Sequence, residues 1–455
     1  MKHIFFILAL VVLVLSCMSG PDFTTDVSKE LYFSTDTLKF DTLFSTVPSA
    51  TKWIKIYNPH KEYIRIAQIG LVSDSSIYRL NVDGENGQSF SDIEIWGKDS
   101  LYIAVEVRPV ENGKRMPVKT EDQLYIDVNG KRKSITLSAH VWDAVLLKGY
   151  VIDTDTAFDA QKPVVVYDSL RINKSAILHV GPGTRFFMHH NAEMIVEGSL
   201  NCEGTAENPV VFRGDRFDRM NGSIAYDHLS GQWGGLYFRN HHGSSALTHV
   251  QIRNASVGIQ VDSLSASESR LTIHNSIIHN SSLSALDIQS GYLEGRGCLF
   301  SNSGSALVNL RNGQADFEYC TFVNYYLFGS KGVCLYVNNK DISLRLSHTI
   351  VWGSKKDELI FKHSQYPHSL EFNYCLLKGS APSPDAVFSN VLWNVDPLFL
   401  RIDPGNYIFD YRIGTNKDLE GFGENRIIPD LSFDYFGAKR DFEKPMIGAF
   451  AQTKD

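Results

Sequence analysis

Six stretches of the sequence share one pattern of apolar, small and turn-forming residues. They are LTHVQIRN (247–254), IHNSIIHN (273–280), GRGCLFSN (295–302), FEYCTFVN (317–324), LSHTIVWG (346–353) and FNYCLLKG (372–379). Successive stretches begin 26, 22, 22, 29 and 26 residues apart. That spacing suits one coil of a parallel β-helix, in which each coil hydrogen-bonds to the next and the loops vary in length. The repeat predicts this fold for residues 150–400.

Three columns of the aligned repeats have a physical explanation. An apolar column would form a continuous spine inside the coils, and it consists of Ile252, Ile278, Phe300, Phe322, Val351 and Leu377. A column of small residues suits a tight part of the coil, where free cysteine acts as a small hydrophobe. Its members are Val250, Ser276, Cys298, Cys320, Thr349 and Cys375.

The third column marks a tight turn. It consists of Asn254, Asn280, Asn302 and Asn324, continued by Gly353 and Gly379. Asparagine and glycine are the residues that best tolerate a left-handed backbone. An asparagine ladder of this kind is typical of right-handed parallel β-helices, and its side chains are expected to hydrogen-bond along the ladder. A further strand, at 258–261, 285–288, 306–309 and 334–337, repeats with steps of 27, 21 and 28 residues.

Residues 29–145 have a different pattern, with short alternating apolar and polar runs separated by turn residues. Examples are 53–57, 101–105 and 124–128, and Asn129-Gly130 predicts a tight hairpin turn after the last of them. The spacing predicts a β-sandwich, so the whole chain is expected to be all-β. The stretch IYNPHKEYIRIAQIGL (56–71) resembles immunoglobulin-like domains of the ASH type. The resemblance implies a spacer or interaction module.

The first seventeen residues, MKHIFFILALVVLVLSC, join a short apolar run to a cysteine. The run has the length of a signal-peptide core and is too short to span a bilayer. Its end, with Ser16 before Cys17, resembles the lipobox of bacterial lipoproteins. That resemblance implies acylation of Cys17, a membrane anchor made of lipid, and a tether over residues 18–28. The alternative is an ordinary signal peptide with an incidental cysteine.

Composition excludes some classes of function. The formal net charge is −7 and the 44 basic residues are spread along the chain, whereas a nucleic-acid partner requires a concentrated basic face. The five cysteines after Cys17 form an odd number and contain no CxxC pair, which argues against a full disulfide framework and against zinc. The sequence therefore predicts no metal and no cofactor.

Other motifs flank the repeats. They are VGPGT (180–184), EGSL (197–200), EGT (203–205), NPVVF (208–212), GQWGGL (231–236), DPLF (396–399) and PMIGAF (445–450). Together with the repeats they resemble right-handed parallel β-helix lipoproteins of Gram-negative bacteria, which belong to the pectate-lyase-like superfold. The resemblance implies an envelope protein anchored to the outer membrane, with residues 401–455 capping the helix. It leaves the periplasmic and surface sides open, and it does not fix chemistry.

The repeats also align charged residues on an outward surface. Glu294 and Asp316 fall on neighbouring coils, about 4.8 Å apart, and His274, Arg296 and Glu318 occupy the adjacent column. Two carboxyls so close would raise one pKa, and a spacing near 5 Å suits a retaining glycosidase. The alternatives are a glycan-binding surface and a solvated surface on which Arg296 neutralises the carboxylates.

Trp233 lies among glycines, where it is expected either in a core or turn or as a platform that stacks on a sugar. Taken together, these patterns predict a membrane-anchored, non-catalytic envelope lipoprotein that presents a β-helix surface to a polysaccharide or an envelope protein. One alternative is a polysaccharide lyase or glycoside hydrolase that uses Glu294 and Asp316. Another is a structural or adhesive spacer without a small ligand.

Overall fold

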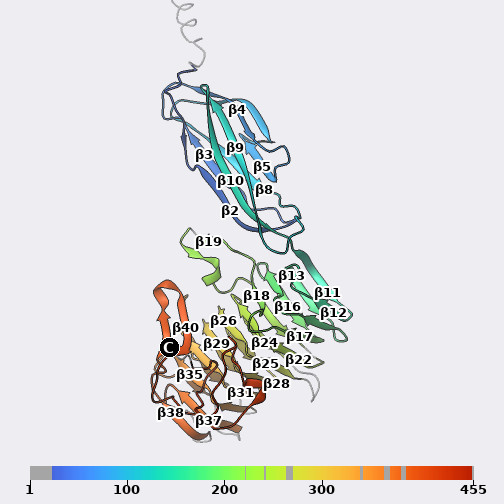
Figure 1. The fold of residues 1–455 in the computed structure, drawn as a ribbon, viewed down its shortest axis with the longest axis vertical. Helices are drawn as coiled ribbons and strands as arrows, with labels where there is room; N and C mark the ends of the chain where they lie inside the picture. Colours follow the sequence, from blue (N-terminus) through green and yellow to red (C-terminus); the bar gives the residue numbers. More distant parts are fainter. Residues whose placement is uncertain are drawn as a thin grey trace, which may run out of the picture. The chain divides into compact units, whose positions relative to one another are not determined.

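The computed structural model describes residues 23–220, 222–239, 242–262, 270–338, 342–362, 369–380 and 386–452. The chain divides into two compact units, with the boundary between Asp143 and Ala144. Both units are built almost entirely of β-strands (Figure 1). The predicted signal peptide and Cys17 lie outside the described residues. No helix in the described part of the chain is long and apolar enough to cross a membrane.

The N-terminal unit is a sandwich of two five-stranded sheets. One sheet has the order β1 (Tyr32–Phe33), β3 (Lys52–Tyr57), β8 (Ser100–Val107), β5 (Tyr78–Val82) and β6 (Glu85–Gly87). The other has the order β2 (Thr37–Phe44), β10 (Lys131–Trp142), β9 (Val118–Val128), β4 (Ile64–Leu71) and β7 (Ser89–Ile95). Alternation explains the packing, because Ile54 and Ile56 are fully buried while the alternating residues Trp53 and Lys55 are exposed.

The second unit is a parallel β-helix in which a typical coil contributes three short strands. The first strands of successive coils form face A, namely β12 (Thr156–Phe158), β14 (Ile177–Val180), β17 (Ser199–Glu203), β22 (Ser245–Thr248), β25 (Leu271–His274), β28 (Tyr292–Arg296), β31 (Gly313–Glu318) and β34 (Ile342–Ser347). The second strands form face B, namely β15 (Arg185–Met188), β18 (Val210–Gly214), β23 (Val250–Arg253), β26 (Ile277–Ser281), β29 (Leu299–Ser303), β32 (Thr321–Asn324) and β35 (Ile350–Gly353). The third strands form face C, namely β16 (Glu193–Val196), β21 (Gly235–Phe238), β24 (Ile259–Val261), β27 (Leu286–Ile288), β30 (Val308–Leu310), β33 (Leu335–Val337) and β36 (Leu359–Phe361).

Longer strands begin and end the helix, and small elements flank it. The first coils use β11 (Val145–Ile152) and β13 (Val164–Ile172), and the last use β37 (Ser369–Leu377) and β38 (Val387–Trp393). A hairpin of β19 (Arg219–Met220) and β20 (Ile224–Ala225) precedes the short helix η1 (Tyr226–His228). The C-terminal segment contains β39 (Phe399–Asp403), η2 (Pro404–Asn406), β40 (Ile408–Ile413) and η3 (Pro429–Leu431).

The strand register confirms the predicted β-helix repeat. Ile252 pairs with Ile278, and the same column continues through Phe300, Phe322, Val351 and Leu377 with the expected steps. The register of the third strand differs by one residue from the predicted one, because Leu286 pairs with Val308 and not with Leu307. The steps there are 27, 22 and 27 residues. Leu307 and Val308 are adjacent apolar residues, so alternation alone could not place the register.

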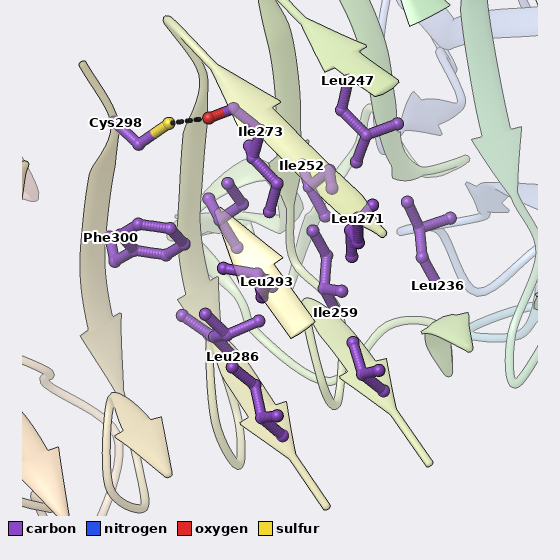
Figure 2. Close-up of a cluster of buried hydrophobic side chains, with 14 of the residues drawn as sticks. Leu236, Leu247, Ile252, Ile259, Leu271, Ile273, Leu286, Leu293, Cys298 and Phe300 are labelled. Carbon is purple, nitrogen blue, oxygen red and sulfur yellow. Dashed lines mark hydrogen bonds between the residues drawn. The ribbon is translucent and has the colours of Figure 1, made fainter. Parts of the chain in front are cut away.

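Side chains from all three faces fill the interior (Figure 2). The small-residue column is fully buried, and its polar atoms satisfy backbone groups at the turn between faces A and B. The Cys298 thiol donates to the Ile273 carbonyl at 3.2 Å, as Figure 2 shows, and the Ser276 hydroxyl accepts from the Val250 amide at 3.0 Å. All five cysteines of the described part of the chain are free and buried, as a packing role requires.

The asparagine column lies at the turn between faces B and C. Asn254, Asn280 and Asn302 have φ of +66°, +59° and +57°, which explains why asparagine is found there. The fourth member of the column, Asn324, does not have a left-handed backbone, and its side chain donates to the Ser303 carbonyl at 3.0 Å. The asparagine side chains therefore do not bond to one another in the expected ladder. Asn254 donates to the carbonyls of Asp227 and Leu229, and Asn280 donates to that of His228. The η1 region lies against these turns and takes the bonds.

The C-terminal segment covers the outer surface of face B (Figure 1). This surface is apolar, with Ile277, Leu299, Val323, Ile350, Trp352 and Leu376. The segment packs against it with Tyr411, Ile413, Leu419, Tyr435, Met446, Ile447 and Phe450. We expected this segment to cover or pack along the last coil, whereas it extends along the side of the helix from β26 to β37. Burial of apolar surface explains the arrangement.

A buried histidine joins the helix to this segment and predicts acid sensitivity. His348 stacks between Tyr319 and Tyr374, and its Nε2 accepts from the Glu424 amide at 2.9 Å. Burial, with Arg426 and Arg440 nearby, lowers the pKa of His348 to about 4. The unfolded chain, with a histidine pKa near 6.5, therefore binds the proton first as the pH falls.

Neutral His348 stabilises the folded chain fully above pH 6.5, and this stabilisation is lost as the pH falls towards 4. At pH 5 the free energy of unfolding is about 2 kcal/mol lower than at neutral pH. We expect His348→Gln to flatten this part of the stability profile, measured as unfolding midpoints in urea from pH 7.5 to 4.5. Equal slopes in the two proteins would contradict the assignment.

Candidate functional site

The charged residues singled out on face A form one patch, as the repeat predicts. Glu294 lies beside Asp316 on the neighbouring strand, and Arg296 lies beside Glu318. His274 occupies the coil before Arg296. The side chains of these residues are partly buried, with exposed fractions between 12% for Glu318 and 29% for Arg296.

Each carboxylate of this charged patch has a cation of its own. Arg296 Nε lies 2.6 Å from Glu294, and Arg345 Nε donates to Asp316 at 3.1 Å. Glu318 binds Arg426 of the C-terminal segment. Three arginines therefore neutralise the carboxylates that would have to interact in an acid/base pair.

The pKa shifts in the patch follow from burial. Burial raises the pKa of Glu318, and Arg426 and Arg296 oppose that rise. Burial also lowers the pKa of His274, against the attraction of Glu294. Such shifts are ordinary in a partly buried ion-pair network, and this geometry favours a neutralised surface over a pair of catalytic carboxylates. The described residues contain no group of three potential metal ligands.

Trp233 does not offer a surface to a sugar. Its side chain is fully buried in the core of the β-helix, and the indole N–H donates to the Arg253 carbonyl at 2.9 Å. Gly235, two residues further on, allows a close approach of the next coil, since a Cβ there would lie 1.8 Å from the Val257 carbonyl oxygen. Of the two expectations for Trp233, the structure shows the core position and not the sugar-stacking platform.

A different site lies where the C-terminal segment meets the turns between faces B and C. It is a small hollow of about 70 Å³, here called the aromatic hollow. Its lining includes Asp227, His228, Asn280, Asn302, Phe328 and Tyr407. The ring of Tyr407 stacks on Phe328 at 5.7 Å and on His228 at 4.8 Å between centroids, with planes within 15° of parallel.

Polar groups in the aromatic hollow are held in place by the surrounding structure. Asp227 forms ion pairs with Arg213 at 3.3 Å and with Arg253 at 3.2 Å. The Tyr411 hydroxyl donates to Asn302 at 2.9 Å. Burial beside Arg253 lowers the pKa of His279 to about 4, so this imidazole is neutral at pH 7. The hollow thus combines stacked rings with fixed hydrogen-bonding groups.

Repeat analysis missed the aromatic hollow because its rings come from outside the repeats. His228 follows the β19–β20 hairpin, Phe328 follows β32, and Tyr407 joins η2 to β40. The feature of the sequence that could have indicated the aromatic hollow is its local content of aromatic residues. The stretches YYLF (325–328) and YIFDY (407–411) are aromatic-rich runs outside the aligned repeats.

Comparisons with known proteins add little. No protein-family model matches the chain, and no curated protein matches it. Among solved structures, a family 123 glycoside hydrolase from Clostridium perfringens matches 26% of this chain and 30% of its own, with 6% sequence identity and a TM-score of 0.19. A likeness that low carries no argument about fold or function. The architecture of the chain is a β-sandwich followed by a parallel β-helix.

Proposed function

We propose that this protein is a lipid-anchored protein of the cell envelope, attached to the outer membrane, whose β-helix unit binds a glycan without cleaving it. The aromatic hollow is the observation that carries the proposal. Sugar rings present apolar faces and polar edges, and the stacked rings of Phe328, Tyr407 and His228 lie beside amide, hydroxyl and imidazole groups that match both.

The anchoring part of the proposal rests on the sequence. The apolar run of residues 4–15 followed by Ser16-Cys17 supports export and acylation at Cys17. Several acyl chains at one terminus give stable attachment to a membrane, whereas one chain gives reversible binding.

The charges around the candidate carboxylates favour binding of a glycan without its cleavage. Hydrolysis of a glycosidic bond uses two carboxyl groups across the scissile bond. Asp227 is the single carboxylate among the described residues that line the aromatic hollow, and two arginines already bind it. On face A, Glu294 and Asp316 are each neutralised by an arginine.

Binding by the whole protein to a panel of neutral oligosaccharides tests the proposal. We expect Tyr407→Ala to weaken binding at least tenfold, about 1.4 kcal/mol, because the middle ring of the stack is lost. Tyr150→Ala is the matched control, since Tyr150 is a partly exposed tyrosine of β11 in the same unit.

Calorimetry gives the affinities, and release of reducing ends and unsaturated uronates measures turnover. Equal affinity in wild type and Tyr407→Ala would overturn the site. Product that disappears in a Glu294→Gln, Asp316→Asn double variant would instead establish an enzyme that uses the charged patch.

A further inference from the structure

The outer surface of the sheet formed by β1, β3, β8, β5 and β6 in the N-terminal unit contains a second hollow. It measures about 700 Å³ and is here called the sheet hollow. Its lining includes Trp53, Arg79, Asn81, Asn86, Glu106 and Arg108. It belongs to the sandwich alone and is independent of the site proposed above.

Strand register explains how the sheet hollow forms. Trp53 of β3, Ala104 of β8 and Asn81 of β5 occupy one row across the sheet, and Asn86 of β6 continues it. Residues directly opposite one another point to the same side of a sheet. The short side chain of Ala104 therefore leaves a floor between the indole of Trp53 and the two amides, which bind each other at 3.0 Å.

Aromatic rings extend this surface beyond the hollow. The side chains of Tyr32, Trp53 and Tyr102 are exposed, and Tyr102 lies at 6.5 Å from Trp53 between ring centroids. Tyr57 pairs with Tyr32 on the same side. Large aromatic residues on an open sheet are costly to leave in water, so their concentration on one face indicates a binding surface.

The charge of the surface selects the ligand. Lys55 lies over the rings of Tyr57 and Tyr102, and Arg79 and Arg108 line the hollow, whereas Glu106 is the one acidic lining residue that the structure describes. The lining itself contains two arginines and one glutamate, a net charge of +1 (2 − 1), on a chain whose formal charge is −7. Arg108 forms an ion pair with Glu106 at 3.0 Å, and Arg79 donates to the Ser76 carbonyl at 2.7 Å, which leaves the rest of its guanidinium for a ligand. A positive surface on an acidic protein attracts an anion.

We propose that the sheet hollow binds an acidic polysaccharide, with Trp53 stacked on a sugar ring and the arginines facing uronate carboxylates. Aromatic rings serve the apolar faces of the sugars, and guanidinium groups suit carboxylates by their planar, paired donors. The chain would then hold two carbohydrate sites of different chemistry, one neutral in the β-helix and one acidic in the sandwich.

The test uses the whole protein, a uronate oligosaccharide of defined length and the same oligosaccharide after its carboxyls are reduced to alcohols. We expect the acidic form to bind at least tenfold tighter than the reduced form and to weaken as NaCl rises from 50 to 500 mM. Trp53→Ala should weaken binding of the acidic form at least tenfold, whereas Tyr407→Ala should leave it unchanged.

Trp96→Ala is the matched control, because Trp96 is 61% exposed against 59% for Trp53 and follows β7 of the other sheet. Equal binding of both oligosaccharides, or unchanged binding in Trp53→Ala, would overturn the proposal. So would a dimer in sedimentation that Trp53→Ala dissociates, since a second copy would then be the occupant. Loss of neutral-glycan binding in Tyr407→Ala reports on the aromatic hollow alone, so the two sites fail separately.

Discussion

Gly235→Ala is expected to destabilise the β-helix by roughly 3–5 kcal/mol, because two costs add at this position. The backbone of Gly235 has φ +140°, which residues with a side chain rarely adopt. A Cβ there would also lie 1.8 Å from the Val257 carbonyl oxygen of the next coil, and neither backbone can move without separating hydrogen-bonded strands.

The matched control is Gly181→Ala, where the nearest atom to a new Cβ would be the Phe158 carbonyl oxygen at 3.6 Å. That is an ordinary contact, and we expect a change within about 1 kcal/mol. Urea unfolding followed by circular dichroism compares the two variants with wild type. Similar midpoints for both variants would show that the coils can separate at Gly235 without cost.

Phe300→Ala is expected to cost about 3–5 kcal/mol of the free energy of unfolding. The ring of Phe300 is fully buried in the spine of the helix (Figure 2). It is in edge contact with Phe317 at 5.8 Å and with Phe322 at 5.3 Å between centroids. Truncation loses the transfer free energy of the ring and leaves a cavity between coils that hydrogen bonds hold in place.

Two control variants test whether the loss of stability in Phe300→Ala comes from the buried ring. Phe300→Leu nearly conserves volume and should cost less than about 1.5 kcal/mol. Phe433→Ala removes a ring that is 54% exposed and should change stability by less than about 1 kcal/mol. If Phe300→Ala and Phe433→Ala shift the urea midpoint equally, the spine does not contribute as the packing indicates.

The β-helix could be predicted from the sequence because its coils repeat in register. Ile252 contacts Ile278 one coil away, so a contact in space becomes a fixed step in the sequence. The turn at Asn254 and the cysteine at Cys298 follow from the same repetition, since the coils at Asn254, Asn280 and Asn302 all require a left-handed residue and the coil interior requires a small one. The predicted register was wrong at Leu307 and Val308, where adjacent apolar residues hide the alternation, and the predicted ladder of asparagine side chains does not form.

The candidate sites were less predictable. The register that brings Glu294 beside Asp316 was readable from the repeats. Arg426, which binds Glu318, lies 108 residues further along the chain and belongs to no repeat. Without that segment the charged patch resembles an open acidic surface, and with it the patch is a compensated network.

By itself, the sequence determined the all-β class, the period of the coils and the residues that point inwards, because those features depend on neighbours at a regular spacing. Tertiary structure decided what covers the outside of the coils. The C-terminal segment buries the apolar surface of face B, and Tyr407 reaches His228 and Phe328 from 179 and 79 residues away in the chain. These contacts do not recur at a regular spacing in the sequence, because they depend on how a segment without repeats packs on the repeating coils.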